Sequence, residues 1–477
     1  MSVQVLIAGA GPTGLTLAID LARRGIGVRI VERAPAPQAG SRGDGIQPRT
    51  LEVFDDLGVL DAVLTAGMPP AAMHIHIGGA QVAERRMSEV RAATPAVPYP
   101  NPWVLGQADT ERLLRQRLAD LGVHVEFGTA LTEFTCDETG VYATLSSIGG
   151  TTSEQADYLV GADGGASTVR RTLAIPFEGT TDESIRMLLG DVTVDGLDHD
   201  FGHWFATPEA PMDGIALMPL PGGALFQFMA PMQRDTEATR AVLQQYLDHR
   251  SGRDGLEVGE PVWSTVWRPN IRLAQRFRSG RALLAGDAAH AHPPNGGQGM
   301  NTGIQDAYNL GWKLAAALAG DDGPLDTYEP ERRAVAMRVL GLSAELLDKH
   351  LEGAENAMER GPETQQLDIS YRAPGDTAVL TAGDRAPDAP LLRSDGSEIR
   401  LFDLLRGPHA TRLTFGLPAE TSETPGIRAY SIVRPGARTD ATQLVAVGGH
   451  AFTDYAAATG TQVLVRPDGY LDWYRQW

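Results

Sequence analysis

The sequence contains one cysteine, no excess of positive charge and no long apolar run. Because Cys136 is the single cysteine, an intrachain disulfide is excluded, which suits a reducing cytoplasm. The formal net charge of −19 would repel a phosphate backbone, so nucleic acid is excluded as the main partner. Glycines and a proline interrupt the first apolar stretch from position 9 onward, so we expect neither a signal peptide nor a membrane span.

The length and the composition indicate a folded protein with several domains. A chain of 477 residues exceeds the size at which single hydrophobic cores stop growing, so we expect two or three domains. Hydrophobic residues make up 42% and charged residues 21%, which argues against wholesale disorder.

The first third of the chain alternates strand and helix patterns. Residues 3–8 read as a buried strand, and apolar residues from Leu15 recur with helical spacing until Gly25. Further segments continue this alternation: a strand at 28–32, helices at 50–60 and from Thr110, and strands at 123–127, 141–146 and 157–161. The pattern predicts a Rossmann-like α/β domain.

The rest of the chain changes rhythm twice. From about 174 to 275, short alternating segments punctuated by proline and glycine predict an inserted antiparallel sheet. After helices near 329–352, a linker rich in Gly, Pro and Thr around 360–376 leads to about a hundred residues with their own strand and turn pattern. Asp468-Gly469 between the last two strands is a strong hairpin signal.

The first motif that carries chemistry is Gly9-Ala10-Gly11-Pro12-Thr13-Gly14, followed by Glu32 and Arg33 at the end of the next strand. Glycines allow a diphosphate to approach backbone amides at a helix N-terminus, and the acid accepts hydrogen bonds from a ribose. Taken alone, the motif could be a tight turn of any doubly wound protein. Its strand, helix and acid predict a dinucleotide site, without deciding between FAD and NAD.

The second motif lies between a buried strand at 281–285 and a long helix at about 301–319. It reads Gly286-Asp287-Ala288-Ala289-His290, then Pro293-Pro294-Asn295-Gly296-Gly297-Gln298-Gly299-Met300-Asn301. Such a segment can set a carboxylate against a ribityl chain and aim helix-terminal amides at a reduced flavin. The alternative, a metal pair of His290 and His292, lacks nearby ligands, so we expect no metal site.

The third motif runs from Gly161 to Arg170 and again follows a strand. Asp163 could bond a ribityl or ribose hydroxyl, and Arg170 an anionic cofactor group. A strand-to-helix turn in which Asp163 caps the helix is an equal alternative.

In this order and spacing, the three motifs resemble those of the group A flavoprotein aromatic monooxygenases, the para-hydroxybenzoate hydroxylase superfamily. The segment 41–50, with Arg42, resembles the mobile flavin loop of this family, and Gln107 resembles its glutamine that binds the ribityl or phosphate portion. The stretches 383–391, 401–405 and 464–474 resemble the thioredoxin-like domain of its polyketide and phenol hydroxylases. That domain lacks Cys-x-x-Cys here, which excludes a disulfide redox role and leaves a structural or dimer-supporting one.

The resemblance implies an α/β fold with three parts. We expect a Rossmann-like FAD-binding domain with trailing helices over 1–73, 104–173 and 276–350, with an inserted antiparallel β-sheet substrate domain over 74–103 and 174–275. A linker over 351–376 then precedes a C-terminal thioredoxin-like α/β domain over 377–477.

FAD is the implied cofactor, with NADPH or NADH as a transient co-substrate. The residues expected to bind the cofactor are Gly9, Gly11, Pro12, Thr13, Gly14, Glu32, Arg33, Arg42, Gln107, Asp163, Asp287, Pro294, Gly297, Gly299, Met300 and Asn301. Arg42 and Pro294 are also the expected neighbours of the reacting centre, since no side-chain nucleophile is needed.

The implied reaction hydroxylates a small aromatic substrate, such as a polycyclic polyketide. NAD(P)H reduces the flavin, dioxygen adds at flavin C4a, and the hydroperoxide gives an electrophilic oxygen to the ring. Candidate substrate contacts are Trp103, Trp204, Met218, Phe226 and Phe228, although for each of them taken singly a core position is the more common role of such a residue. We expect a monomer or homodimer without nucleic-acid or membrane partners.

Three alternatives remain open at this point. The same scaffold could insert oxygen beside a carbonyl in a Baeyer–Villiger reaction. A flavin-dependent halogenase would show Trp-x-Trp-x-Ile-Pro, whereas residues 263–269 have the wrong spacing. A non-catalytic resistance protein would bind flavin or ligand without turning over.

Overall fold

The computed structural model describes residues 3–182, 185–232, 236–292, 297–351, 359–419, 425–436 and 443–476. The chain forms two compact units. Unit 1 consists of Met1–Gln47, Asp61–Glu89 and Pro102–Thr364, and unit 2 consists of Pro48–Leu60, Val90–Asn101 and Gln365–Trp477. Pro294, predicted to lie near the reacting centre, falls outside the described residues.

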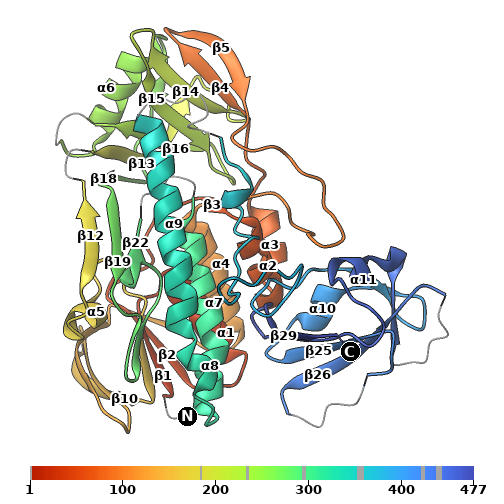
Figure 1. Cartoon of the computed structure of the whole chain (residues 1–477). Helices are drawn as coiled ribbons and strands as arrows, with labels where there is room; N and C mark the ends of the chain where they lie inside the picture. Colours follow the sequence, from red (N-terminus) through yellow and green to blue (C-terminus); the bar gives the residue numbers. More distant parts are fainter. Residues whose placement is uncertain are drawn as a thin grey trace. The chain divides into compact units, whose positions relative to one another are not determined.

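The core of unit 1 is a six-stranded sheet with the order β20-β21-β11-β1-β2-β7 (Figure 1). Its strands are β1 (Val5–Ala8), β2 (Val28–Glu32), β7 (Val125–Phe127), β11 (Tyr158–Gly161), β20 (Arg278–Ser279) and β21 (Ala282–Leu284). All pairs except β20–β21 are parallel. The residues of β1 and β21 are buried without alternation, as expected for parallel strands covered on both faces. The strand, glycine turn, helix and strand predicted at the start are confirmed.

Three helices pack beside this sheet. They are α1 (Pro12–Ala22), α4 (Gln107–Asp120) and α7 (Gly299–Leu318), and α1 contacts both of the others. The other helices described in unit 1 are α3 (Leu60–Ala66), α5 (Thr168–Thr172), α6 (Arg240–Ser251), α8 (Gly323–Asp326), α9 (Tyr328–Leu351) and the short η1 (Gly286–Ala288) and η2 (Pro362–Thr364). Within the described residues, we find no helix with the length and apolar character that crossing a bilayer requires.

Three small sheets complete the Rossmann-like part. They are the meander of β8 (Ala130–Cys136), β9 (Val141–Ser147) and β10 (Gly150–Ala156), the sheet of β12 (Phe177–Thr181), β19 (Asn270–Ala274) and β22 (His290–Ala291), and the pair of β3 (Gly45–Ile46) with β6 (Trp103–Val104). The sequence pattern had predicted only β9 of the meander. Its neighbour β10 is mostly exposed and rich in Thr and Ser, so it lacks an apolar alternation.

An eight-stranded sheet forms the other half of unit 1, with the order β17-β13-β16-β15-β14-β4-β5 and β18 paired to β13. Its strands are β4 (Met73–Ile77), β5 (Ala80–Arg85), β13 (Met187–Asp195), β14 (Gly202–Thr207), β15 (Ala210–Pro219), β16 (Leu225–Pro231), β17 (Glu257–Val258) and β18 (Trp263–Trp267). The predicted antiparallel character is confirmed, with one difference: β14 runs parallel to β4. Helix α6 (Arg240–Ser251) packs on one face through Leu243 and Leu247.

Unit 2 contains a seven-stranded sheet with the order β24-β23-β27-β26-β25-β28-β29. Its elements are α2 (Pro48–Leu57), β23 (Pro390–Leu392), β24 (Glu398–Arg400), α10 (Leu401–Leu405), β25 (Ala410–Phe415), β26 (Ile427–Val433), β27 (Gln443–Ala446), η3 (Val447–Gly449), α11 (His450–Asp454), β28 (Gln462–Val465) and β29 (Leu471–Arg475). The parallel pair β26–β25 followed by antiparallel β28 and β29 is the thioredoxin-like arrangement expected from the sequence. Gly469 has φ +78°, which confirms the predicted hairpin turn.

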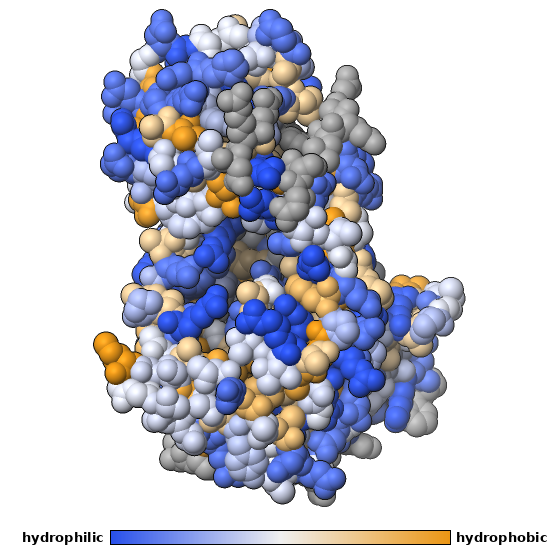
Figure 2. Space-filling model, turned by 90° about the vertical axis from the view of Figure 1, so that its left-hand side faces the viewer, coloured by the Kyte–Doolittle hydropathy of each residue, from blue (hydrophilic) through white to orange (hydrophobic). Residues whose placement is uncertain are grey.

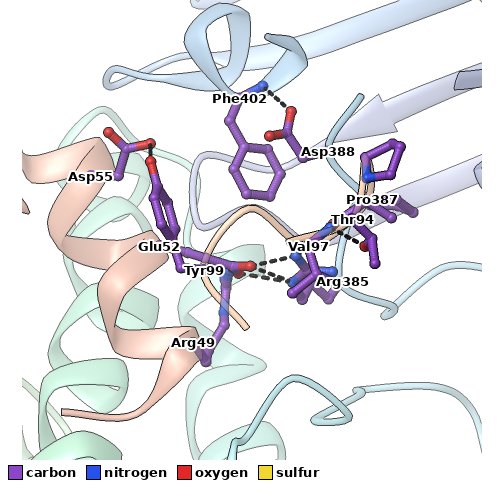
Figure 3. Close-up of polar contacts among 12 residues, drawn as sticks. Arg49, Glu52, Asp55, Thr94, Val97, Tyr99, Arg385, Pro387, Asp388 and Phe402 are labelled. Carbon is purple, nitrogen blue, oxygen red and sulfur yellow. Dashed lines mark hydrogen bonds and ion pairs between the residues drawn. The ribbon is translucent and has the colours of Figure 1, made fainter. Parts of the chain in front are cut away.

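Helix α2 and the segment 90–101 belong to unit 2 through buried polar contacts (Figure 3). Glu52 on α2 accepts hydrogen bonds from Arg49 at 2.7 Å and from Arg385 Nε at 2.8 Å. Burial alone would raise the pKa of Glu52, but the two guanidinium groups hold it below its usual value. Asp55 on the next turn accepts from Arg406 and from Tyr99. These ion pairs fix α2 against elements more than 300 residues away in the sequence.

Candidate cofactor and active site

The predicted dinucleotide turn connects β1 to α1 and contacts the third motif. Gly9 has φ +102°, and a Cβ there would lie 2.3 Å from the carbonyl oxygen of Ala162. A Cβ on Gly14 would lie 2.1 Å from the Gly9 oxygen. Gly11, in contrast, has no atom within 4 Å of such a position, so this side of the turn is open. The first amides of α1 have no acceptor within the helix, which is the arrangement that binds a diphosphate.

Thr13 brings the first and second motifs together. A Cβ on Gly286 would lie 2.5 Å from Thr13 Oγ1, and a Cβ on Gly303 of α7 would lie 2.4 Å from the same atom. The absence of side chains at both glycines therefore lets η1 and α7 pack directly against the start of α1. All three predicted motifs meet around the β1–α1 turn.

Glu32 is fixed at the end of β2. One carboxylate oxygen accepts from the Ala10 amide at 3.0 Å and the other from the Ala34 amide at 2.9 Å. Each oxygen keeps a lone pair for a further donor, such as a ribose hydroxyl. The adjacent Arg33 is exposed.

Asp163 uses one carboxylate oxygen at the start of α5 and leaves the other without a partner in the described part of the chain. Its Oδ2 accepts from the amides of Thr168 and Val169 at 2.6 and 3.2 Å, as a cap of α5. Its Oδ1 is buried and has no partner within the described residues, so it remains available to a cofactor hydroxyl. Arg170 uses its guanidinium within the protein, donating to the carbonyl oxygens of Ala288 and Gly165 at 2.8 and 2.7 Å.

Asp287 lies on η1 in the second motif. Its side chain is exposed, yet desolvation by the surrounding protein raises the pKa of its carboxyl. An exposed carboxyl at this position is accessible to a hydroxyl group of a bound ligand. The amide of its neighbour Gly286 donates to Asp306 of α7 at 3.0 Å.

A buried charge network that the sequence did not reveal includes His290 of the second motif. Asp306 accepts from His290 Nε2 and from Arg332 Nε, each at 2.6 Å, and all three side chains are at most 1% exposed. Burial would raise the pKa of Asp306, but Arg332 and His290 hold it below its usual value. His290, once considered as a metal ligand, is therefore a partner of Asp306.

Asn301 connects the start of α7 to the predicted flavin loop. Its Oδ1 accepts from the Gln47 amide, and its Nδ2 donates to the carbonyl oxygens of Gly45 and Gly297, each at 2.8 Å. Gly297 has φ +63°, and Gly299 and Met300 are the first residues of α7. The positive end of this 20-residue helix points its free amides toward the same region.

The flavin loop itself is held at several points. Gln227 of β16 donates to the Ser41 carbonyl oxygen at 2.7 Å. Arg42 is exposed and contacts Gln38 at 2.6 Å. The Gln107 amide donates to the Gly43 carbonyl, whereas the Gln107 side chain donates to Glu111, each at 2.8 Å.

Asp191 is a residue that the sequence analysis missed. It lies on β13, is 2% exposed and interacts with both the amide and the hydroxyl of Ser41. Its other oxygen, Oδ1, is buried with no partner in the described part of the chain. Burial raises the pKa of Asp191 to about 6, with a smaller contribution from Asp44. An acid that titrates close to neutral pH thus faces the flavin loop.

The two faces of the eight-stranded sheet separate the predicted substrate residues. Trp204 and Met218 belong to an apolar group with Met73, Ala206, Ala216 and Met229. Gln227 alternates with Phe226 and Phe228 along β16, so it marks the face turned to the flavin loop. Phe226 and Phe228 lie on the opposite face, in the core beneath α6, and Trp103 lies on β6 opposite Ile46. The two phenylalanines therefore pack in the core beneath α6, whereas Trp204 and Met218 lie on the face turned to the flavin loop.

The face shown in Figure 2 is mainly hydrophilic, with scattered apolar residues. It is hollowed at mid-height, where pale and apolar residues lie between hydrophilic ones. Gly11 has open space beside it, Asp163 has a buried oxygen without a partner in the described part of the chain and Asp287 is exposed, so the residues present fit a bound FAD.

Comparison with known proteins agrees with this geometry. Residues 2–343 match the model of the FAD binding domain family. A flavin-dependent monooxygenase of Mycobacteroides abscessus is 43% identical over 98% of this chain and 96% of its own. A 12-dehydrotetracycline 5-monooxygenase/anhydrotetracycline 6-monooxygenase of Streptomyces rimosus is 32% identical over 99% and 95%.

A solved structure extends the similarity to three dimensions. Aklavinone-11 hydroxylase, in a ternary complex with FAD and aklavinone, superposes with a TM-score of 0.84 at 27% identity, covering 99% of this chain and 95% of that one. A family match over most of the chain and a 43% identical relative together decide the question. The chain belongs to the FAD binding domain family and, within it, to the group A FAD-dependent aromatic monooxygenases.

Proposed function

We propose that this monooxygenase hydroxylates an electron-rich, polycyclic aromatic substrate of the polyketide type, with dioxygen as the oxidant and NADPH or NADH as the reductant. The observation that carries the substrate class is the similarity, over at least 95% of both chains, to enzymes named for tetracycline precursors and for aklavinone. Those names describe fused-ring substrates, and an apolar group on the sheet face that carries Gln227 would pack against such a molecule.

The residues around the β1–α1 turn would hold FAD. The amides at the start of α1 would bind the diphosphate, Glu32 a ribose, and Asp287 and Asp163 the ribityl hydroxyls, while the start of α7 would face the ring. When bound, FAD supplies the redox chemistry by accepting hydride from the nicotinamide and activating dioxygen. The protein contributes binding, orientation and a partial positive charge at the α7 N-terminus.

The antiparallel sheet would position the substrate. Trp204 and Met218, with Ala216 and Met229, provide apolar contacts on the face that carries Gln227 and Asp191. Trp204 is held in place because its indole N–H donates to the Pro211 carbonyl at 3.1 Å. Excluding water from this face would protect the oxygenation from side reactions.

Arg42 would act from the flavin loop. The exposure of its side chain leaves it free to approach an anionic cofactor group when the loop moves. The two ends of the moving segment would stay in place. Ser41 is held by its hydrogen bond from Gln227, and Gln47 is held by its hydrogen bond to Asn301.

The test is turnover with a panel of substrates. The purified enzyme, reconstituted with FAD, is supplied with NADPH, isotope-labelled dioxygen and a set of phenols, anthraquinones and tetracyclic quinones. We expect substrate-stimulated NADPH oxidation with a fused-ring compound and a product that has gained one labelled oxygen as a hydroxyl group. A lactone product would instead show Baeyer–Villiger insertion. Binding without NADPH oxidation throughout the panel would indicate sequestration and contradict the proposal.

The cellular setting and assembly state are part of the same proposal. The single cysteine supports a reducing cytoplasm, and we propose a monomer or homodimer in solution. Light scattering coupled to size-exclusion chromatography measures the assembly state directly.

A further inference from the structure

Three histidines form a compact cluster in the antiparallel sheet, on the face opposite Trp204. His74 and His76 lie on β4, and His203 lies on the parallel neighbour β14, directly opposite His74 in the register. One ring nitrogen from each lies within 4.8 Å of the corresponding nitrogens of the other two. His203 alternates with Trp204 along β14, so the cluster does not share the surface proposed for the substrate.

We propose that His74, His76 and His203 bind a divalent transition-metal ion of the Zn²⁺ type, which fastens β4 to β14. This departs from the expectation that the protein has no metal site, which rested on the different pair His290 and His292.

The spacing of the nitrogens is the first argument. His203 Nδ1 and His76 Nε2 are 3.4 Å apart, which is long for a hydrogen bond. Two nitrogens bound to one zinc ion at about 2.0–2.1 Å in tetrahedral geometry would be about 3.4 Å apart. The two imidazoles are therefore already placed as neighbouring ligands.

The second argument is that outer partners are in place for two of the three imidazoles, those of His203 and His74. His203 Nε2 lies 2.7 Å from the Asp198 carbonyl oxygen, an acceptor, so Nε2 carries the proton and Nδ1 presents a lone pair. His74 Nε2 lies 3.4 Å from a carboxylate oxygen of Glu84 on β5. A carbonyl or carboxylate on the far side of the ring is the usual outer shell of a metal-binding histidine.

The third argument is burial. His76 is 5% exposed and His203 is 3% exposed, so an ion held between their rings would be shielded from solvent.

The surroundings also select the ion. Phe201 stacks on His74 with ring centroids 3.9 Å apart, and Phe205 stacks on His76 at 4.6 Å. Neutral imidazoles in an apolar shell favour Zn²⁺ and related ions over Ca²⁺ or Mg²⁺, which prefer oxygen ligands.

The test uses the tag-free, FAD-loaded enzyme, which is stripped of metal with a chelator and then incubated with Zn²⁺. After desalting, we expect one equivalent of Zn²⁺ per chain, measured by elemental mass spectrometry. The enzyme should also unfold at a higher temperature with Zn²⁺ than without it. Co²⁺ in place of Zn²⁺ should give visible d–d bands beyond the flavin absorption, with the intensity of a tetrahedral site.

Variants assign the ligands. His76→Gln and His203→Gln should reduce retained Zn²⁺ to background, and Glu84→Gln should weaken binding about tenfold. The matched control His124→Gln changes an exposed histidine of the same unit and should retain the metal. Flavin content and circular dichroism verify that each variant folds.

Three results would overturn the proposal, and the first of them requires only the wild-type enzyme. If the wild-type enzyme retains no Zn²⁺ and shows no thermal shift, the cluster is only a group of stacked imidazoles. If His124→Gln loses the metal as completely as His76→Gln, or if folded His76→Gln and His203→Gln retain it, the metal binds elsewhere.

Discussion

The side-chain amide of Gln227 donates a hydrogen bond of 2.7 Å to the carbonyl oxygen of Ser41, a residue 186 positions earlier in the sequence. Asp191, on the neighbouring strand, interacts with the amide and hydroxyl of the same serine. The antiparallel sheet therefore holds the start of the flavin loop through both the acceptor and the donors of one residue. The sheet that we propose to position the substrate therefore also fixes the start of this loop.

The carboxyl of Asp191 should make stability depend on pH. Its pKa is about 6 in the folded protein against 3.8 as a reference, so the folded state keeps a proton that the unfolded state has released. Wild-type stability therefore falls as the pH rises from about 4 to about 6. Asp191→Asn has no ionisable group at this position, so its stability should not fall in this way. The free energy of unfolding of the variant minus that of the wild type should therefore increase across that window by at most about 3 kcal/mol. Urea unfolding at both ends of the window measures it, and a pH-independent difference would refute it.

Gly11 and Gly14 should respond differently to the same substitution. Gly11 has φ −73° and open space beside it, so Gly11→Ala should leave the FAD-free protein within about 0.5 kcal/mol of wild type. Its methyl group would occupy the proposed diphosphate site, so FAD affinity should fall about tenfold or more.

In Gly14→Ala the new Cβ would lie 2.1 Å from a backbone oxygen, which should destabilise the FAD-free protein by about 1–3 kcal/mol. Thermal unfolding and flavin fluorescence titration separate the two effects. Equal stability losses in both variants would show that Gly11 serves only the turn.

Asp287→Ala should yield largely FAD-free protein, because the substitution removes the carboxylate proposed to bind the ribityl chain. The ratio of flavin to protein absorbance after purification measures the effect. Asp254→Ala, which changes an exposed acid of the same unit, is the control and should retain full flavin. Full flavin in Asp287→Ala as well would remove this residue from the cofactor site.

Arg332 and Asp306 should be costly to separate. Asp306→Asn leaves a fully buried guanidinium without its charge partner, so the free energy of unfolding should fall by about 3–5 kcal/mol. Asp321→Asn, an exposed substitution nearby in sequence, should change it by less than about 0.5 kcal/mol.

The pH dependence has the opposite sign to that of Asp191. Because the pKa of Asp306 is lowered on folding, its contribution is present above the unfolded pKa and is lost as the pH falls below it. Wild type and Asp306→Asn should therefore converge in acid, and parallel curves would count against the ion pair.

Glu52→Gln tests the contacts of α2 within unit 2. The substitution leaves Arg49 and Arg385 facing a neutral amide, and we expect a loss of about 3 kcal/mol in the stability of unit 2. Glu398→Gln, at an exposed position of the same unit, is the control. Hydrogen exchange of α2 and β25 reports on the unit separately, and unchanged exchange rates in Glu52→Gln would show that the ion pairs contribute little.

The sequence predicted the features that depend on local chemistry. The glycine turn after β1, the buried strands β2 and β21 and the Asp468-Gly469 hairpin each follow from residue types at fixed short spacings. The same holds for α7, although its predicted start lay two residues after the observed Gly299.

Features that depend on distant pairing were beyond the sequence pattern. Asp306 and Arg332 are single charged residues on two helices, and nothing local indicates that both are buried against each other. Alternation along β16 does place Phe226 and Phe228 on one face, but it does not say which face meets the cofactor domain. Gln227, which settles that, is identified only by its contact with Ser41.

Because of the way the chain is divided, unit 2 can complete its fold only late in synthesis. Pro48–Leu60 and Val90–Asn101 emerge early from the ribosome, yet the residues that complete their fold begin at Gln365. The two early segments therefore cannot complete their fold until most of unit 1 has been synthesised. If a protease cut the chain just before Gln365, the C-terminal fragment would keep its ion pair with Glu52 of α2. Cleavage there should therefore not by itself separate the fragment from the rest of the enzyme.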